Sequence, residues 1–323
     1  MKWSVLGVPW IRRVQTSFVF AFVLFILFCL TLWCCCIINP LLWFFYIPYL
    51  LFVTFIDRAP SKGGRPFKFI IHSSFWKTFS AYFPTSLIFQ DDWNTTAEKK
   101  DKYLFALHPH GVVGLGVWAN ILSNGGGLHS LLSGLNLRVI TLPVNFFIPI
   151  WREFILALGL IDSHEQSIQN ALKKGCSVGI VIGGAAEALD ALPNKDYKLT
   201  LKRRRGFIRV ALTHGIPIVP VFSFGENDLF YQARHPLLRK VQNFAKKYMG
   251  FSSPLFIGRG VFNYSFGLLP HRKRIVTVIG KPIPVTQIDS PTKEQLNQMH
   301  KIYVEALKEL FYAHRDEHDP NRE

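Results

Sequence analysis

The chain is short of acidic residues. Its 323 residues include 21 Asp and Glu against 37 Lys and Arg, which gives a formal net charge of +16 at pH 7. A surplus of this size predicts an anionic partner: nucleic acid, a membrane surface or a phosphate-bearing small molecule. No zinc-finger spacing or other nucleic-acid-binding signature accompanies the charge, so no nucleic-acid partner is expected.

Signatures of several enzyme classes are missing as well. No Gly-x-Ser-x-Gly nucleophile elbow appears, because the formal match at 175–179 opens the strand predicted at 177–182 instead of following a strand, so a serine nucleophile on the usual strand-to-helix turn has no support. No His/Glu spacing suggests a metal site, and no cofactor is expected. The five cysteines do not suit a disulfide framework, because four of them lie in one apolar stretch near the N-terminus. A reducing, cytosol-facing environment is the simpler interpretation.

Charge is absent from residues 17–38, where Phe, Leu, Val, Ile and Cys dominate. A helix needs about 20 apolar residues to cross a hydrocarbon core, so this run is long enough for one crossing. After Asn39-Pro40, a second uncharged run covers residues 41–56 and contains Pro48. It could span the bilayer with a kink or re-enter without crossing. Basic residues flank both ends of the pair, which favours a hairpin with both ends in the cytosol.

The composition changes at a linker rich in Gly and Pro, and three regions result. We expect residues 1–58 to form the membrane hairpin, 59–101 a linker with an aromatic segment on the membrane surface, and 102–323 the main domain. In the main domain, short apolar runs alternate with helical patterns. Strands are predicted at 103–108, 137–141, 177–182, 217–222 and 274–279, and a helix at 206–214. This alternation predicts an α/β fold with a largely parallel sheet and flanking helices.

The first of these strands ends in His108-Pro109-His110-Gly111. Proline fixes its own φ and glycine permits a sharp turn, and the apolar stretch at 112–121 predicts a helix behind the turn. In α/β sheets, ligands bind at the carboxyl ends of the strands. Two imidazoles in one such turn are therefore candidates for proton transfer. The alternative is a pair of satisfied histidines that cap the strand.

Two more polar turns and one basic run accompany this turn. Gly183 and Gly184 follow the strand at 177–182 and could turn their amides toward an anion. Glu187, just behind them, could orient an imidazole, as the acid of a catalytic triad does. The strand at 217–222 is followed by Glu226, Asn227 and Asp228. Four cations precede the helix at 206–214 and predict an anion site, although a solvated loop is the alternative: Lys202, Arg203, Arg204 and Arg205.

Taken together, these motifs resemble the motif set of the type-2 diacylglycerol acyltransferase family, which includes monoacylglycerol and wax-alcohol acyltransferases. The motifs are Tyr82-Phe83-Pro84, His108-Pro109-His110-Gly111, Gly183-Gly184-Ala185-Ala186-Glu187, Arg205-Gly206-Phe207 running on to Val219-Pro220, and Phe224-Gly225-Glu226-Asn227-Asp228. The double apolar segment matches too, so the resemblance covers nearly the whole chain. The family is distantly similar to glycerolipid acyltransferases with a His-x-x-x-x-Asp pair, but here Val113 and Leu115 occupy the acid positions.

The resemblance implies a glycerolipid-acyltransferase-like domain in an enzyme of the endoplasmic-reticulum membrane, also found on lipid droplets. The enzyme would transfer a fatty acyl group from acyl-CoA, its co-substrate, to the hydroxyl of diacylglycerol, and so form triacylglycerol. Monoacylglycerol and long-chain wax alcohols are the alternative acceptors. The sequence does not decide among them, nor does it give the acyl-chain preference or decide whether the protein is a homo-oligomer.

For the chemistry we expect direct acyl transfer. His110 would act as general base, His108 would position it or bind substrate, and Glu187 would hold the other imidazole nitrogen, although which histidine is the base is left open. Backbone amides near Gly111 or Gly183-Gly184 could hold the thioester oxyanion. The remaining residues are predicted to contact substrate, the basic ones at the CoA phosphates: Pro109, Gly111, Gly183, Gly184, Lys202, Arg203, Arg204, Arg205, Glu226, Asn227 and Asp228.

Two other functions would use the same features. A lipid hydrolase would use the histidines to activate water, and it would consume acyl-CoA without forming an ester. A non-enzymatic membrane scaffold that binds lipid would explain the hairpin and the charge alone, and it would show no transferase activity.

Overall fold

The computed structural model of the protein describes residues 7–90, 102–233, 235–249, 252 and 254–322. The α-helices are α1 (Trp10–Ile38), α2 (Trp43–Leu51), α3 (Lys68–Ile71), α4 (Ser74–Tyr82), α6 (Leu128–Leu131), α7 (Trp151–Ala157), α8 (Glu165–Lys173), α9 (Gly184–Ala188), α10 (Gly206–His214), α11 (Pro236–Met249) and α12 (Lys293–His318). The strands are β1 (Ser86–Phe89), β2 (Leu104–His108), β3 (Leu137–Thr141), β4 (Leu160–Asp162), β5 (Ser177–Val181), β6 (Ile218–Phe224), β7 (Tyr231–Gln232), β8 (Phe256–Ile257) and β9 (Val276–Ile279).

The main sheet has seven strands in the order β1-β9-β6-β2-β5-β3-β4. All of its neighbouring strands are parallel except β6 and β9, which are antiparallel. The central strands β2 and β6 are buried along their whole length, as expected for parallel strands covered on both faces. The predicted α/β class with a largely parallel sheet is therefore confirmed.

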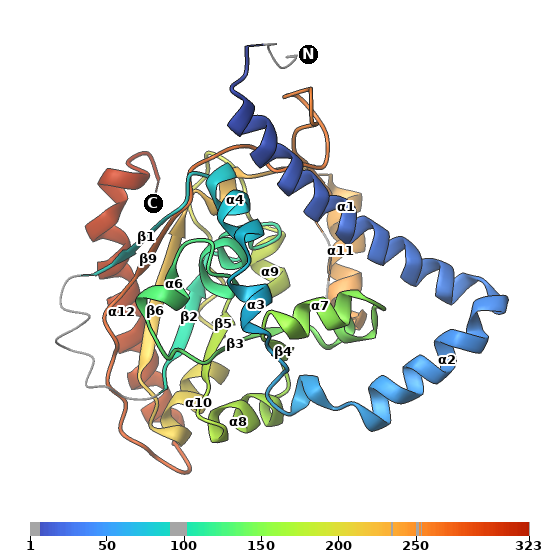
Figure 1. Ribbon diagram of the computed structural model, residues 1–323. Helices are drawn as coiled ribbons and strands as arrows, with labels where there is room; N and C mark the ends of the chain where they lie inside the picture. The colour runs from blue at the N-terminus through green and yellow to red at the C-terminus, as the bar shows by residue number, and fades with distance from the viewer. Residues whose placement is uncertain (1–6, 91–101, 234, 250–251, 253, 323) are drawn as a thin grey trace.

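Helices cover the sheet on both faces (Figure 1). On one face, Leu104 and Ala106 of β2 belong to a core cluster with residues of α8, α10 and α12. On the other face, Phe105 and Leu107 belong to a cluster with residues of α1, α4 and α7. Because side chains alternate along a strand, β2 supplies both cores. The strand that carries the histidine turn is thus held from both sides.

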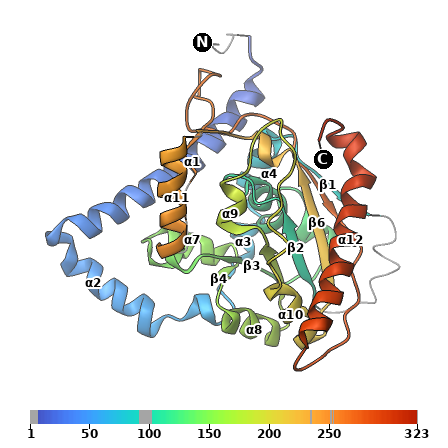
Figure 2. The same ribbon diagram turned by 180° about the vertical axis from the view of Figure 1, so that it is seen from behind.

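The two apolar runs form a pair of helical segments that meet at an angle and project from the domain as a V (Figures 1 and 2). The segments are Trp10–Ile38 and Pro40–Ser61, and both are long and apolar enough to cross a membrane. The second is irregular: a 3-10 turn (Pro40–Leu42), α2, a π-helical turn (Phe52–Ile56) and another 3-10 turn (Ala59–Ser61) follow one another. Both open ends of the V contact the domain. Arg272 of the domain donates to the carbonyl oxygen of Arg12 in α1, and Arg152 of the domain forms an ion pair with Asp57, just behind the second segment's π-helical turn.

The first of these helices is also part of the domain. Phe22 of α1 is 3% exposed and packs edge-on against Trp76 and Phe79 of α4. Aromatic pairs in this geometry add stability beyond their buried area. The hairpin is therefore anchored by its own side chains.

The region between the hairpin and β2 is more deeply buried than its sequence predicts. Trp76, Phe79 and Tyr82 of α4 lie in the core, and β1 pairs in parallel with β9 at the edge of the sheet. All of the predicted strands begin at residue 103 or later, so the prediction missed β1. Phe67 and Phe69 are exposed, so a membrane-surface position for that part of the segment stays a prediction. Residues 91–101 of the predicted linker lie outside the described residues.

Candidate functional site

The three polar turns lie at one edge of the sheet. Strands β6, β2 and β5 are neighbours and parallel, so their carboxyl ends lie together. His110, the start of α9 at Gly184 and the turn that contains Glu226 follow these three ends. This clustering comes directly from the strand order.

His110 is partly buried and lines a cavity beside this edge. Its Nδ1 lies 3.0 Å from the carbonyl oxygen of Gly111. A carbonyl can only accept, so Nδ1 carries the proton and Nε2 is the free acceptor of the neutral ring. Burial lowers the pKa of His110 below its ordinary value, although the Gly111 contact opposes this. The imidazole is therefore neutral at pH 7, as a general base must be.

Glu187 does not hold the imidazole. Its Oε1 accepts the backbone N–H of His110 at 2.7 Å, and its Oε2 accepts the N–H of Thr200 at 3.0 Å. The predicted contact with the ring is therefore wrong, because both carboxylate oxygens are used on the backbone. Glu187 fixes the main chain of the histidine turn and ties it to the segment in front of the basic run.

His108 faces the other side of the sheet. Its Nε2 lies 2.9 Å from the hydroxyl of Tyr303 on α12, and the residue is 1% exposed. Burial lowers the pKa of His108 to about 3, so the ring stays neutral. The ring is enclosed and does not line the cavity, so the substrate contact predicted for His108 has no support in this geometry and stays a prediction. Of the two histidines, His110 is the one placed for chemistry.

Glu226 holds the turn behind His110. Its two carboxylate oxygens accept the backbone N–H groups of Leu115 and Gly116, at 2.9 and 2.7 Å. Burial raises the pKa of Glu226 to about 8 against the effect of these amides. The residue is 3% exposed and does not line the cavity, so its predicted substrate contact has no support in this geometry and stays a prediction. Nothing in the sequence distinguished this role from that of a solvated turn residue.

The same carboxylate explains why the predicted helix at 112–121 starts late. The π-helical turn η4 covers only Val117–Leu122. Gly111 adopts φ +61°, and a Cβ built on it would lie 2.5 Å from the Glu226 side chain. The chain passes over the carboxylate before it can coil, and only glycine fits at that point.

The two other residues predicted at this turn have structural partners. Asn227 is buried, and Asp228 forms an ion pair with Arg322 near the C-terminus. Neither lines the cavity. Their predicted substrate contacts are not supported by these positions and stay a prediction.

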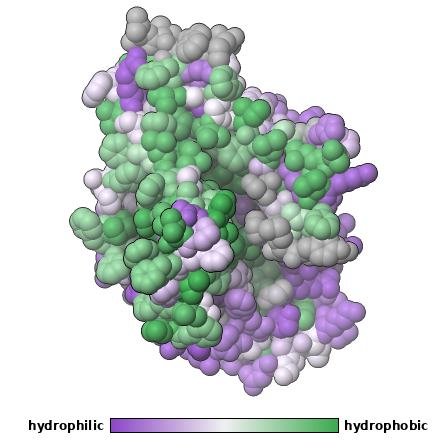
Figure 3. Space-filling model, turned by 90° about the vertical axis from the view of Figure 1, so that its right-hand side faces the viewer, coloured by the Kyte–Doolittle hydropathy of each residue, from purple (hydrophilic) through white to green (hydrophobic). Residues whose placement is uncertain are grey.

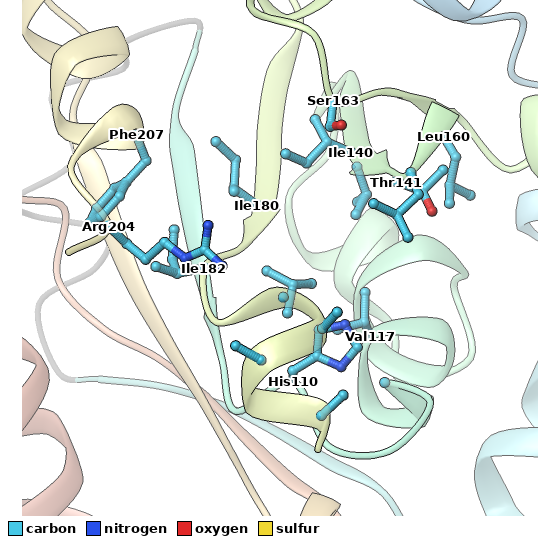
Figure 4. A pocket seen from close by; sticks show the side chains of 18 of the residues that line it. His110, Val117, Ile140, Thr141, Leu160, Ser163, Ile180, Ile182, Arg204 and Phe207 are labelled. Atoms are coloured by element: carbon cyan, nitrogen blue, oxygen red, sulfur yellow. The ribbon is translucent and has the colours of Figure 1, made fainter. Parts of the chain in front are cut away.

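The basic run reaches the cavity from the segment in front of α10. Arg203, Arg204 and Arg205 line it, whereas Lys202 is exposed beside it. The Nη2 of Arg204 lies 3.4 Å from the carbonyl oxygen of Gly183. Figure 4 shows the Arg204 guanidinium extending toward the space beside His110. Three cations thus stand at one side of the cavity, where an anionic group can be met.

The cavity has a volume of about 900 Å³. From the His110 and Arg204 side it continues to Ile140, Leu160 and Ile180, which are apolar (Figure 4). Ile26 of α1 also lines it, so the cavity meets the membrane helix. Sequence reasoning missed these apolar residues, since a buried strand end looks the same whether it lines a cavity or a core.

A neutral imidazole, a cationic side and a long apolar cavity beside a membrane helix suit an enzyme that joins an anionic co-substrate to a lipid. The chain belongs to the diacylglycerol acyltransferase family: the family profile with the description "Diacylglycerol acyltransferase" matches residues 35–323. The predicted family and the predicted class of enzyme, a membrane-associated acyltransferase, are confirmed.

Individual relatives agree with this assignment. Diacylglycerol O-acyltransferase 2 of Dictyostelium discoideum is 41% identical, over 96% of this chain and 94% of that protein. 2-Acylglycerol O-acyltransferase 1 of Bos taurus is 40% identical, over 98% of this chain and 95% of that protein. The crystal structure of the 1-acyl-sn-glycerophosphate acyltransferase PlsC from Thermotoga maritima matches 93% of this chain and 97% of that protein. The two are 11% identical in sequence, with a TM-score of 0.40. That likeness is loose, and the family assignment does not depend on it.

Proposed function

We propose that this protein transfers a fatty acyl group from acyl-CoA to the hydroxyl of diacylglycerol, with His110 as the general base. The observation that carries the proposal is the Nδ1 contact with the Gly111 carbonyl, 3.0 Å long. It leaves Nε2 unprotonated on a side chain that lines the cavity. A lipid hydroxyl has a pKa far above 7 and needs such a base as it attacks.

The reaction balances without any other group. Nε2 takes the hydroxyl proton as the oxygen attacks the thioester carbonyl. The C–S bond then breaks, and the imidazolium returns the proton to the CoA thiolate. The arginines at 203–205 would bind the CoA phosphates, and the apolar part of the cavity would hold hydrocarbon chains. The oxyanion donors stay a prediction at Gly111 or Gly183-Gly184. The amides of Leu115 and Gly116 are already bonded to Glu226.

Monoacylglycerol is the second candidate acceptor, because relatives at similar identity are named 2-acylglycerol O-acyltransferases. We propose the endoplasmic-reticulum membrane as the location, with lipid droplets as a second site. A hairpin with both ends in the cytosol is supported by its basic flanks and by the return of both ends to the domain. Association of copies stays a prediction.

Replacing His110 by alanine tests the proposal. General-base catalysis is typically worth ~10²–10⁴-fold, so ester formation should fall by that factor while the amount of protein in the membrane stays the same. The assay supplies one labelled acyl-CoA with diacylglycerol, monoacylglycerol and a long-chain alcohol together. His214→Ala, at the far end of α10, is the matched control.

Near-normal turnover by His110→Ala would refute the base assignment. Loss of acyl-CoA without ester in the native enzyme would instead indicate a hydrolase. No reaction at all would indicate a lipid-binding scaffold.

A further inference from the structure

Helix α11 (Pro236–Met249) turns an apolar stripe outward. Leu237, Val241 and Phe244 are 64%, 59% and 65% exposed. Their spacing of four and three residues places them on one side of the helix. A surface helix of a water-soluble domain directs such a stripe toward the core instead.

The polar side of α11 is the side that meets the protein. Arg239 forms an ion pair with Asp190 at 2.5 Å and donates to the carbonyl oxygen of Leu189 at 2.9 Å. Gln242 is 8% exposed. The helix is thus fixed to the domain by polar groups, with Leu237, Val241 and Phe244 outside. This orientation suits contact with hydrocarbon.

The helix lies on the side of the molecule that carries the hairpin. Figure 1 shows α11 behind α1 at the open end of the V, and Figure 2, the view from behind, shows α11 in front of α1. Figure 3 looks onto this side and shows hydrophobic surface on both sides of a hollow. Ile26 of α1 and Pro254, just beyond α11, line the same cavity. Helix α1 and the segment that follows α11 therefore both line the cavity.

Charge supports a lipid partner with anionic headgroups. Residues 229–288, which include α11, contain no Asp or Glu, whereas ten of them are Lys or Arg. A helix with an apolar stripe inside a segment of this charge has the composition of an interfacial membrane helix. Basic residues near an anionic leaflet add to the binding that the apolar side chains supply.

We propose that α11 docks on the phospholipid bilayer as a second membrane contact. It would lie in the plane of the leaflet, with Leu237 and Val241 among the acyl chains. The hairpin and α11 would then enclose the cavity mouth between them, so that a lipid acceptor enters sideways from the leaflet. This docking goes beyond the acyl-transfer chemistry and can be tested without catalysis.

The test places a photo-crosslinking residue in the full-length protein. Val241→p-benzoylphenylalanine is compared with the same substitution of Ile302, which is exposed on α12, on the far side of the sheet from the hairpin (Figure 1). Both proteins are reconstituted in vesicles of phosphatidylcholine with phosphatidylserine, irradiated and analysed by mass spectrometry. We expect phospholipid adducts at position 241 and few at 302. Equal adducts at both positions, none at 241, or adducts of 241 with a second copy of the chain would overturn the proposal.

A functional comparison uses Leu237→Gln/Val241→Gln. Glutamine keeps the helix, so folding should be unaffected. The KM for diacylglycerol in vesicles should rise several-fold while the KM for acyl-CoA stays the same. Leu131→Gln/Ile302→Gln, which also removes two exposed apolar side chains, should change neither constant. Identical acceptor KM values for the two double variants would contradict a role of α11 at the mouth of the cavity.

Discussion

Replacing Glu226 by alanine would remove the support of the turn behind His110. The carboxylate accepts two buried amides, those of Leu115 at 2.9 Å and Gly116 at 2.7 Å. A buried amide left without its acceptor costs ~1–3 kcal/mol, so the pair costs about 2–6 kcal/mol. The substitution also removes the cost of burying the Glu226 carboxyl group. That cost is visible in the pKa of Glu226, which burial raises to about 8. We therefore expect a net loss near the lower end, about 2–3 kcal/mol in the free energy of unfolding.

The same variant should damage catalysis more than binding. Without Glu226, the segment 111–116 can shift, and the His110 ring moves with it. A misplacement of about 1 Å can cost ~100-fold in rate, so kcat should fall by about two orders of magnitude. The KM for acyl-CoA should change little, because the basic run lies on a different element. Glu226→Gln keeps one acceptor oxygen and should give an intermediate kcat.

The measurements are acyl-CoA kinetics in lipid nanodiscs and thermal unfolding of the same samples. Glu305→Ala, at an exposed position on α12, is the control. If Glu226→Ala unfolds like the native protein and keeps its kcat, the carboxylate does not position the turn. If kcat and both KM values change together, the variant is globally destabilised, and the specific positioning role is refuted.

Two further predictions concern charge. Burial lowers the pKa of His110 from its ordinary value of 6.5, so kcat/KM should stay level down to about that pH and fall only in more acidic solution. A pH–rate profile checks this, and an acid limb above 6.5 would contradict it. Changing Arg203, Arg204 and Arg205 together to Gln should raise the KM for acyl-CoA roughly tenfold and leave the acceptor KM unchanged. Each charge-assisted phosphate contact is worth ~1.5–3 kcal/mol before exposure reduces it. Kinetics in neutral micelles check this, and an unchanged acyl-CoA KM there would assign the arginines to the membrane surface.

Strand pattern and turn residues were enough to predict where the site lies. Short apolar runs closed by Pro or Gly located β2, β3 and β5 to within a residue, and parallel pairing brought the polar ends of β6, β2 and β5 together. The partners of the carboxylates could not be predicted. A carboxylate after a strand can meet a ring or the backbone, and sequence does not say which way it turns. Glu187 and Glu226 both turned to the backbone.

The hairpin shows a second limit of sequence reasoning. Its apolar run predicts a membrane helix, but the same residues also pack on the domain: Phe22 contacts Trp76, Phe79 and Trp118. Composition cannot separate side chains that face lipid from those that face protein, because both are apolar. For this reason β1 and α4 looked like a surface segment. The domain includes part of the hairpin, so deleting residues 17–56 would expose these aromatic side chains.

The backbone contacts of Glu187 also bear on the chemistry. A carboxylate against the imidazole would stabilise the imidazolium and raise the pKa of His110. Here the carboxylate holds the main chain, and burial lowers that pKa instead. The leaving group of the proposed reaction is a thiolate, whose parent thiol has a pKa of about 8.5. Return of the proton from an imidazolium of lower pKa to this thiolate is therefore downhill, and the base is regenerated without help from water. A paired histidine would take the first proton more readily but would release it to the thiolate less readily. For acyl transfer from a thioester, a base fixed by its backbone and without a carboxylate at its ring therefore favours the second of these two proton transfers.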